Sequence, residues 1–364
     1  MGQACTECMG GKERPACHFA PDCVLEGSKA MLDIGLTRVR SMGPIAAAIV
    51  RAGGSVRRVF RQAELPIAAS DEPDLLIPLR DQLRVLEYAS REIGDTAFAG
   101  RLSLTGGVEC LGSFGTHVLA APRLDYAIAR CNRHIGSMLQ TTTRMEVVRE
   151  GAAIKWTYGL TDSVTVGRTG NELLALGYMV DLLRHFLGES WTPMRVELSA
   201  LRAAEVGSIR DLFGCDVIQG PSAAAVVFGN TCLGAPSRWR SRPERGTTPV
   251  LSSIAPGAVP QPSELVAVVE LLLLLNLLDR QRTQQAACRR MRVSVRTLQR
   301  RLAEHGVSFE RLLANVIVRH AAALLESPRS ITEISFELGY SDSAHFSRAF
   351  ARWTGMSPSA WRRR

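Results

Sequence analysis

Hydrophobic positions recur with a helical period over much of the chain and with a strand period in its middle third. Apolar residues three or four positions apart share one face of a helix, and this spacing predicts helices over 43–65, 79–92, 124–139, 171–187 and 202–213. Alternation of apolar and polar residues predicts strands over 142–149, 152–160, 194–200, 217–219 and 223–228, with a hairpin turn at Glu150-Gly151. Together these elements predict an α+β domain over residues 41–233.

The composition of the chain changes after residue 233. Residues 234–263 are rich in Pro, Ser, Gly and Arg and poor in apolar residues, which indicates a linker. Only helical patterns follow, so residues 264–364 are predicted to form an all-α domain. The most apolar segment, Leu265–Leu278, is shorter than the roughly 18–20 residues that a membrane span needs. We therefore expect a core helix there and no membrane partner.

The first forty residues are rich in Gly and Cys and are predicted to form a disordered leader. No secretory signal is visible in it, so a cytoplasmic protein with reduced thiols is expected; a later initiation codon is an alternative. Four leader cysteines could ligate zinc tetrahedrally, although their last gap is wrong for a zinc ribbon: Cys5, Cys8, Cys17 and Cys23. Because no folded unit surrounds them, we expect neither a metal nor a cofactor.

The net positive charge of the chain is confined to its C-terminal quarter. Residues 281–364 contain 15 Arg, no Lys and 6 acidic residues, which gives +9, the net charge of the whole chain. Such a basic block favours a polyanionic partner, usually DNA or RNA. A solvated basic tail would lack the apolar periodicity of this segment. We expect a folded nucleic-acid-binding domain.

The first of two helical units in this block spans residues 283–304. A short helix and a turn lead to Ser294, whose hydroxyl is placed to cap the next helix. That helix has one apolar face, made by Val295, Leu298 and Leu302. Its other face consists of Arg296, Thr297, Gln299, Arg300 and Arg301. Because Arg can pair with guanine and Gln with adenine in the major groove, this pattern predicts a recognition helix.

The second unit spans residues 331–353. Thr332 is placed to cap its first helix, Gly339 permits a left-handed turn, and Ser343 is placed to cap its second helix. The second helix has an apolar face of Phe346, Ala349, Phe350 and Trp353, and an outward face of His345, Ser347, Arg348 and Arg352. A helix over 309–325 holds the two units apart. The alternative is an arginine-rich helical bundle without DNA-binding function.

The segments RTLQRRLAEHGVSF and ITEISFELGYSDSAHFSRAFARWTGMSPSAWR resemble the C-terminal domain of the AraC/XylS family of bacterial transcription regulators. The resemblance covers about residues 264–362. It implies two recognition helices, Ser294–His305 and Ser343–Thr354, that enter successive major grooves, and a short closing helix from Pro358. The chain departs from the family at Ser335 and Phe336, one of which is usually Ala, and in residues 280–290.

The N-terminal half resembles regulators of the ornithine-utilisation and VirS type in the segments GVECLGSFGTHVLAAPRLDYAIARCNRHI and FGCDVIQGPSAAAVVFGNTCLGAP. This resemblance implies a ligand-binding or dimerisation domain. The whole chain is then expected to be a transcription activator and not an enzyme. Its expected partners are double-stranded DNA, RNA polymerase, a small-molecule effector and a second copy of itself. The sequence identifies neither the effector nor the residues that bind it.

Within this picture the outward-facing residues of the two recognition helices are the candidate DNA-binding residues. They are Ser294, Arg296, Thr297, Gln299, Arg300, Ser343, His345, Ser347, Arg348 and Arg352. The other arginines of the block, including Arg362 to Arg364, are expected to attract DNA without sequence preference. His320, on the connecting helix, is expected to be structural.

Two other classes of function stay open at this point. The N-terminal half could be an enzyme or sensor with DNA binding secondary, which turnover by residues 40–232 alone would support. However, the Gly-rich segment 104–116 lacks the Lys of a phosphate-binding loop, and the pair Cys110 and His117 lacks an orienting partner for nucleophilic catalysis. An RNA-binding protein would need an aromatic stacking surface that the sequence does not offer.

Overall fold

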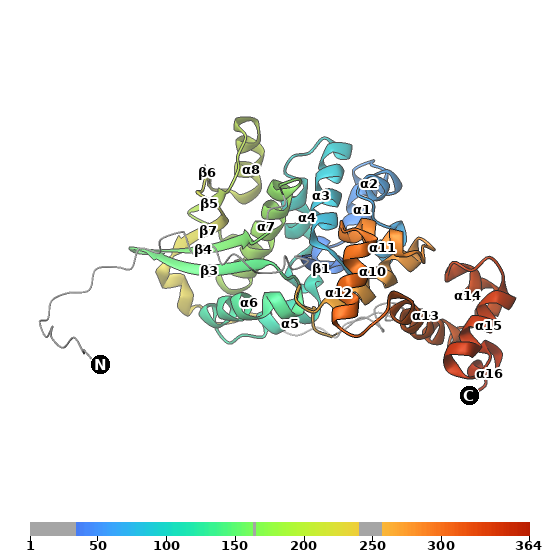
Figure 1. Cartoon of the computed structure of the whole chain (residues 1–364). Helices are drawn as coiled ribbons and strands as arrows, with labels where there is room; N and C mark the ends of the chain where they lie inside the picture. Colours follow the sequence, from blue (N-terminus) through green and yellow to red (C-terminus); the bar gives the residue numbers. More distant parts are fainter. Residues whose placement is uncertain (1–33, 163–164, 240–256) are drawn as a thin grey trace, which may run out of the picture. The chain divides into compact units, whose positions relative to one another are not determined.

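A computed structural model describes residues 34–162, 165–239 and 257–364 (Figure 1). The four leader cysteines and residues 240–256 of the predicted linker lie outside these described residues. Within them, no helix has the length and apolar character that crossing a bilayer requires. The described His, Cys, Asp and Glu residues form no group that could hold a metal ion.

The N-terminal region of the described chain combines helices with two sheets, as the predicted α+β class requires. Its strands are β1 (Leu36–Arg38), β2 (Leu76–Pro78), β3 (Thr143–Glu150), β4 (Ala153–Leu160), β5 (Arg195–Leu198), β6 (Asp216–Gln219) and β7 (Ala224–Gly229). Its α-helices are α1 (Ile45–Arg51), α2 (Val56–Gln62), α3 (Leu79–Ile93), α4 (Phe98–Gly106), α5 (Ser113–Leu119), α6 (Leu124–Met138), α7 (Arg168–Leu187) and α8 (Val206–Phe213). Short 3-10 turns are η1 (Val39–Met42), η2 (Ile67–Asp71), η3 (Val108–Leu111), η4 (Ala203–Glu205) and η5 (Asn230–Gly234).

The larger sheet has the strand order β3-β4-β7-β5-β6, with β5 and β6 parallel and the other neighbours antiparallel. Helix α7 contacts β4, β5 and β7, and α3 and α4 pack against α7 (Figure 1). The predicted hairpin between β3 and β4 is confirmed, with Gly151 in the left-handed region at φ +62°. Alternate residues of β4 are buried, among them Trp156 and Tyr158, so one face of this strand points into the core.

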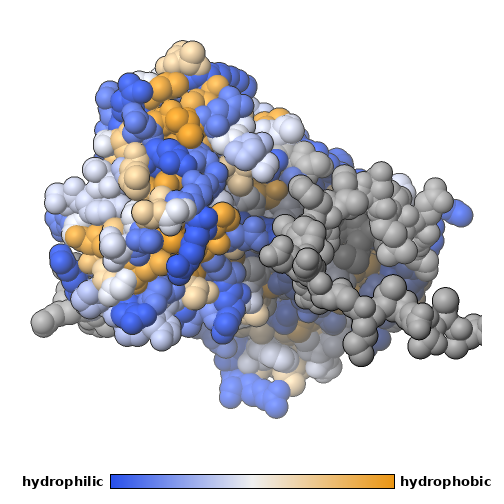
Figure 2. Space-filling view, turned by 90° about the vertical axis from the view of Figure 1, so that its left-hand side faces the viewer, coloured by the Kyte–Doolittle hydropathy of each residue, from blue (hydrophilic) through white to orange (hydrophobic). Residues whose placement is uncertain are grey.

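The outer strand β3 carries mixed charges along the open edge of this sheet. Val147 and Val148 are exposed there, but charged residues flank them, and Arg144 forms an ion pair with Glu146. Figure 2 shows apolar residues interspersed with hydrophilic ones on this side of the molecule. Charges on an edge strand disfavour pairing with strands of other chains.

Two sequence-based expectations about the start of this region are wrong. The predicted helix over 43–65 is broken into α1 and α2, because Gly53 turns left-handed at φ +79° and the Ser55 hydroxyl accepts the Arg58 N–H at 3.3 Å to begin α2. The predicted leader ends earlier than residue 40. Residues 36–38 form β1, which pairs with β2, and Leu36 is fully buried.

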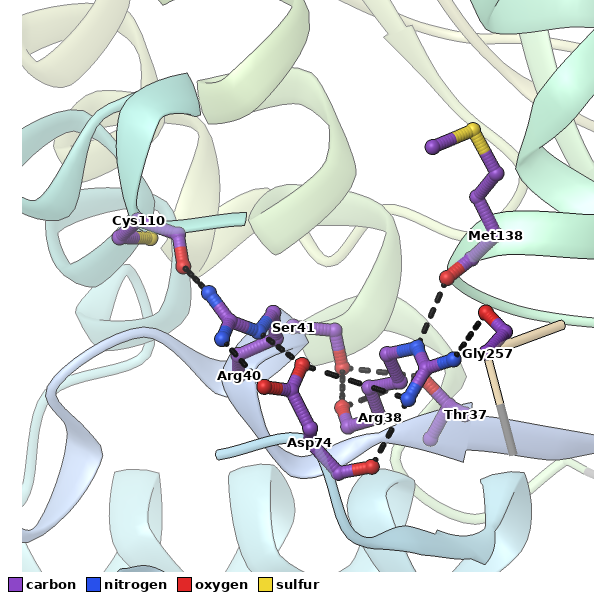
Figure 3. A network of polar contacts seen from close by, with 8 residues as sticks. All are labelled: Thr37, Arg38, Arg40, Ser41, Asp74, Cys110, Met138 and Gly257. Atoms are coloured by element: carbon purple, nitrogen blue, oxygen red, sulfur yellow. Dashed lines mark hydrogen bonds and ion pairs between the residues drawn. The ribbon is translucent and has the colours of Figure 1, made fainter. Parts of the chain in front are cut away.

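Arg38 of β1 anchors three separate segments (Figure 3). Its guanidinium donates hydrogen bonds to the carbonyl oxygens of Met138 at 2.8 Å, Asp74 at 2.9 Å and Gly257 at 2.8 Å. The neighbouring Arg40 pairs with both carboxylate oxygens of Asp74 at 2.7 Å. Burial lowers the pKa of Arg38, against the opposing effect of Asp74. The strand is thus tied to the end of α6, to the chain before β2 and to Gly257.

Replacing Arg38 with Met, which keeps much of the unbranched stem but removes the guanidinium, should lower the free energy of unfolding by about 1–3 kcal/mol. The three carbonyl oxygens would lose their donor. Because these contacts are only part-buried, water can replace part of them, so we expect a total near the cost of one fully buried unsatisfied acceptor. Urea unfolding followed by circular dichroism measures the change. Arg149→Met on the exposed edge of β3 is the control and should change stability by less than about 0.5 kcal/mol. Equal effects of both variants would contradict the anchoring role.

The C-terminal region contains only helices, which confirms the predicted class. They are α10 (Leu265–Leu278), α11 (Gln284–Met291), α12 (Val295–Glu304), α13 (Phe309–Leu325), α14 (Ile331–Glu337), α15 (Ser343–Thr354) and α16 (Pro358–Arg362). Helix α10 is apolar on all sides and buried along nearly its whole length, as predicted for a core helix. Helix α13 contacts α10, α14, α15 and α16 and so connects the two units of the domain.

Candidate nucleic-acid interface

The first helix-turn-helix unit consists of α11 and α12. Arg292 turns the chain in the left-handed region at φ +56°, and the Ser294 hydroxyl then accepts the N–H of Thr297 at 3.0 Å. The predicted cap of α12 is therefore confirmed. Leu298 and Leu302 are buried, which turns the opposite face of the helix outward.

The outward face of α12 exposes Arg296, Gln299 and Arg300. The Arg300 side chain is 68 % exposed, and its nearest ion-pair partner is Glu304 at 4.0 Å. Gln299 donates a hydrogen bond to Gln284 of α11 at 3.2 Å. Thr297 is half-buried, and its hydroxyl lies 2.8 Å from that of Ser294. The two arginines are thus the most available donors of this helix, and their part in base reading stays a prediction.

The second unit consists of α14 and α15, and both of its predicted caps are wrong by a small shift. Ser330, not Thr332, caps α14, because its hydroxyl accepts the Glu333 N–H at 3.1 Å while the Glu333 carboxylate accepts the Ser330 N–H at 2.7 Å. Asp342, not Ser343, caps α15 and accepts the N–H of His345 at 2.6 Å. Each true cap has the extended backbone that the cap position requires.

Helix α15 has the predicted two-faced character. His345, Arg348 and Arg352 are exposed, while Ser343 and Ser347 are half-buried. Phe346, Ala349 and Phe350 are buried, whereas Trp353, which we expected to be buried, is half-buried. The Phe350 ring lies 5.7 Å from that of Phe346 and 5.6 Å from that of Trp361 in α16. The aromatic cluster fixes the inner face of α15, so the arginines face outward.

The turn of the second unit is fastened to the chain that precedes the first unit. Gly339 has φ +77°, and a Cβ at this position would lie 2.7 Å from the carbonyl oxygen of Arg280, so only glycine fits. Arg282 donates to the Gly339 carbonyl at 3.0 Å, and its guanidinium lies 3.8 Å from the centre of the Tyr340 ring. Sequence reasoning missed this structural role of Arg282.

Other arginines of the basic block are also held by the protein itself. Arg290 is largely buried, donates to the Asn276 side chain at 2.8 Å and lies 3.4 Å from the carboxylate of Asp81. Arg362 donates to the Leu325 carbonyl at 3.2 Å, at the end of α13. For Arg362 this adds a structural role to the expected attraction of DNA. Neither role follows from the local sequence, because each partner is distant along the chain.

Three other residues singled out in the sequence, His320, Cys110 and His117, contact other parts of the protein. His320 is buried on α13, as expected, and desolvation lowers its pKa to about 4, so it is neutral at pH 7. Cys110 lies 3.3 Å from the Tyr178 hydroxyl, while the His117 ring packs edge-on against His134 at 4.8 Å. The structure thus gives Cys110 and His117 different partners.

Comparison with protein families gives two matches. A profile described as the arabinose-binding domain of AraC transcription regulators, N-terminal, matches residues 53–237, just over half of the chain. A profile described as a helix-turn-helix domain matches residues 287–364.

Similar proteins match over part of the chain. The chain is 41% identical over 91 residues to the HTH-type transcriptional activator RhaR of Salmonella schwarzengrund, which covers 24% of this chain and 32% of that protein. It is 42% identical over 79 residues to RhaR of Salmonella arizonae, a match that covers 21% of this chain and 28% of that protein. The chain thus spans less than a third of the length of these relatives.

Two solved structures are similar to parts of the chain. The transcriptional regulator CdpR from Pseudomonas aeruginosa is 19% identical, with 73% of this chain and 86% of that chain covered and a TM-score of 0.32. The C-terminal domain of AraT, a response regulator from Geobacillus stearothermophilus, is 30% identical, with 28% and 85% covered and a TM-score of 0.25.

The helix-turn-helix profile covers most of α11 and all of α12 to α16, and the N-terminal profile covers the larger sheet, α7 and the helices that pack on α7. The expected resemblance to the AraC family is confirmed over both halves. The chain belongs to the AraC family of transcription regulators.

Proposed function

We propose that this protein binds specific sites in double-stranded DNA through α12 and α15 and activates transcription there under the control of a small-molecule effector. The main observation that supports the proposal is that both helices have the same two-faced structure. Each buries an apolar face and exposes arginines, Arg296 and Arg300 on α12 and Arg348 and Arg352 on α15. Arginine is the side chain that most often reads guanine in the major groove.

The proposal places different tasks in the two regions. Residues 257–364 would bind DNA, and the N-terminal region would bind the effector and bias DNA binding by its differential affinity for two states of the protein. RNA polymerase and a second copy of the chain are the proposed protein partners, and the cytoplasm is the proposed location. Activation is supported by the names of the RhaR relatives, which describe them as transcriptional activators.

Mapping of the DNA sites bound by the protein across the genome of its source tests this function. We expect a small set of bound sites that lie upstream of genes and share a recurring sequence. Purified protein should bind a DNA fragment with this sequence more tightly than a shuffled fragment of equal length. Specific binding usually exceeds non-specific binding by a factor of about 10³–10⁷. Equal affinity for both fragments at the same salt concentration would contradict sequence-specific regulation.

A further inference from the structure

The N-terminal region contains a partly open cavity beside its larger sheet. Its volume is about 60 Å³, and one water needs about 10–15 Å³. The cavity therefore has room for several non-hydrogen atoms. Its walls come from α3, α5, α6, α7, β3 and β4 and from the turns η1 and η3, elements far apart in the sequence.

Most of the cavity wall is apolar. Side chains that form it include Leu111, Phe114, Ile135, Trp156, Leu174 and Met179, all buried. Among the described residues that line it there is no Asp, Glu, Lys, Arg or His. A charged ligand would therefore lose its hydration without gaining an ion-pair partner, a loss that proteins avoid.

One part of the wall is polar but uncharged. Gln82 donates to the Asn171 side chain at 2.9 Å, and Asn171 donates to the Tyr158 hydroxyl at 2.8 Å. Gln140 also donates to the Tyr158 hydroxyl, at 2.7 Å. All four side chains are at most 4 % exposed. Gln140 donates its other amide hydrogen to Thr143 at 2.6 Å, and Gln82 is bonded to Ser41, Gln140 and Asn171. An amide has two donor hydrogens and two acceptor lone pairs, and one hydrogen of Asn171 is used, so its second N–H can bond a hydroxyl or carbonyl placed in the cavity.

The titratable groups of the wall keep it neutral. Burial raises the pKa of the Cys131 thiol, and it raises the pKa values of the Tyr158 and Tyr178 phenols. All three side chains are uncharged at pH 7.

From the cavity we infer that the effector of this protein is a small, uncharged and mainly apolar molecule with one hydroxyl or carbonyl, which bonds the group formed by Gln82, Gln140, Asn171 and Tyr158. This inference rests on the proposed effector control. It departs from the description of the matching profile, which names arabinose. A pentose carries hydroxyls around its whole ring, and most of them would face apolar side chains without partners, which costs free energy for each unpaired group.

Isothermal titration calorimetry on the full-length protein at pH 7 tests the inference with three probes. Cyclohexanol and cyclohexylamine have the same size, but the amine is charged at this pH, and L-arabinose is uncharged but polar throughout. We expect cyclohexanol to bind at least tenfold more tightly than either of the other two. Comparable or tighter binding of cyclohexylamine or L-arabinose, or no binding of cyclohexanol, would overturn the inference.

A variant pair locates the binding. Ala175 of α7 lines the cavity, so Ala175→Leu should fill it and weaken cyclohexanol binding at least tenfold. Ala129 lies exposed on α6, and Ala129→Leu is the matched control that should leave binding unchanged. Equal affinities of both variants would place the probe elsewhere and overturn the inference. The wild-type comparison of probes decides the question even if Ala175→Leu does not fold.

The same protein preparation separates this inference from the proposed function. If the protein binds its promoter fragment but not cyclohexanol, the neutral-effector inference is wrong and DNA binding stands. If cyclohexanol binds as expected but the protein does not distinguish promoter from shuffled DNA, the proposed function is wrong and the assignment of the cavity stands.

Discussion

The double variant Arg300→Ala/Arg348→Ala should bind the target DNA site more weakly by about 2–6 kcal/mol. Each substitution removes an exposed donor from one recognition helix, and loss of a base-reading arginine costs about 1–3 kcal/mol. The two residues lie on separate helices, and effects at distant sites add approximately. Fluorescence anisotropy with the target fragment and a shuffled fragment, at one salt concentration, measures the loss of specific binding.

The control for this variant removes the same charge from another part of the chain. Arg91→Ala/Arg149→Ala changes two exposed arginines outside the helix-turn-helix units. It should reduce the general attraction to DNA slightly but keep the preference for the target fragment. If the Arg300/Arg348 variant keeps that preference equally well, α12 and α15 are not the recognition helices in the sense proposed here.

Phe350→Ala should lower the free energy of unfolding by about 3–5 kcal/mol, the range for truncation of a buried Phe. The side chain is fully buried and contacts the rings of Phe346 and Trp361, so its removal leaves a cavity between α15 and α16. Thermal and urea unfolding of the protein, followed by circular dichroism, measure the loss.

Phe336→Ala is the matched control for this truncation. Phe336 belongs to the same unit but is 44 % exposed on α14, so its loss should cost less than about 0.5 kcal/mol. Similar melting temperatures for the two variants would show that Phe350 does not hold the unit together.

The helices of the DNA-binding region could be predicted closely because their signals are local. The predicted span 309–325 coincides with α13, because apolar spacing marks it, and the span 343–354 that the family resemblance implies coincides with α15. The caps themselves were harder to place. Asp342 and Ser343 can both cap a helix, and only the backbone angles decide between them. Similarly, Gly53 breaks the predicted helix 43–65 although the apolar pattern continues across it.

Features that depend on distant partners could not be predicted. Arg282 and Arg290 look like any other arginine of the basic block, yet they bond residues 57 and 209 positions away along the chain. The polar group of the cavity likewise joins Gln82, Gln140 and Asn171, which the sequence keeps in three separate segments. No periodicity or motif marks such pairs, because the tertiary fold alone brings them together.

The different caps of α12 and α15, the two proposed recognition helices, give their first turns opposite electrostatic character. The N-terminus of a helix carries a partial positive charge that attracts phosphate. At α12 the cap is the neutral Ser294, whereas at α15 it is Asp342, a carboxylate whose pKa the His345 N–H lowers. The ionised Asp342 offsets that partial charge and repels a DNA phosphate, while Ser294 leaves the attraction in place. The first unit should therefore bind the DNA backbone more tightly, and its binding should weaken more as the salt concentration rises. The second unit should depend more on contacts with the bases.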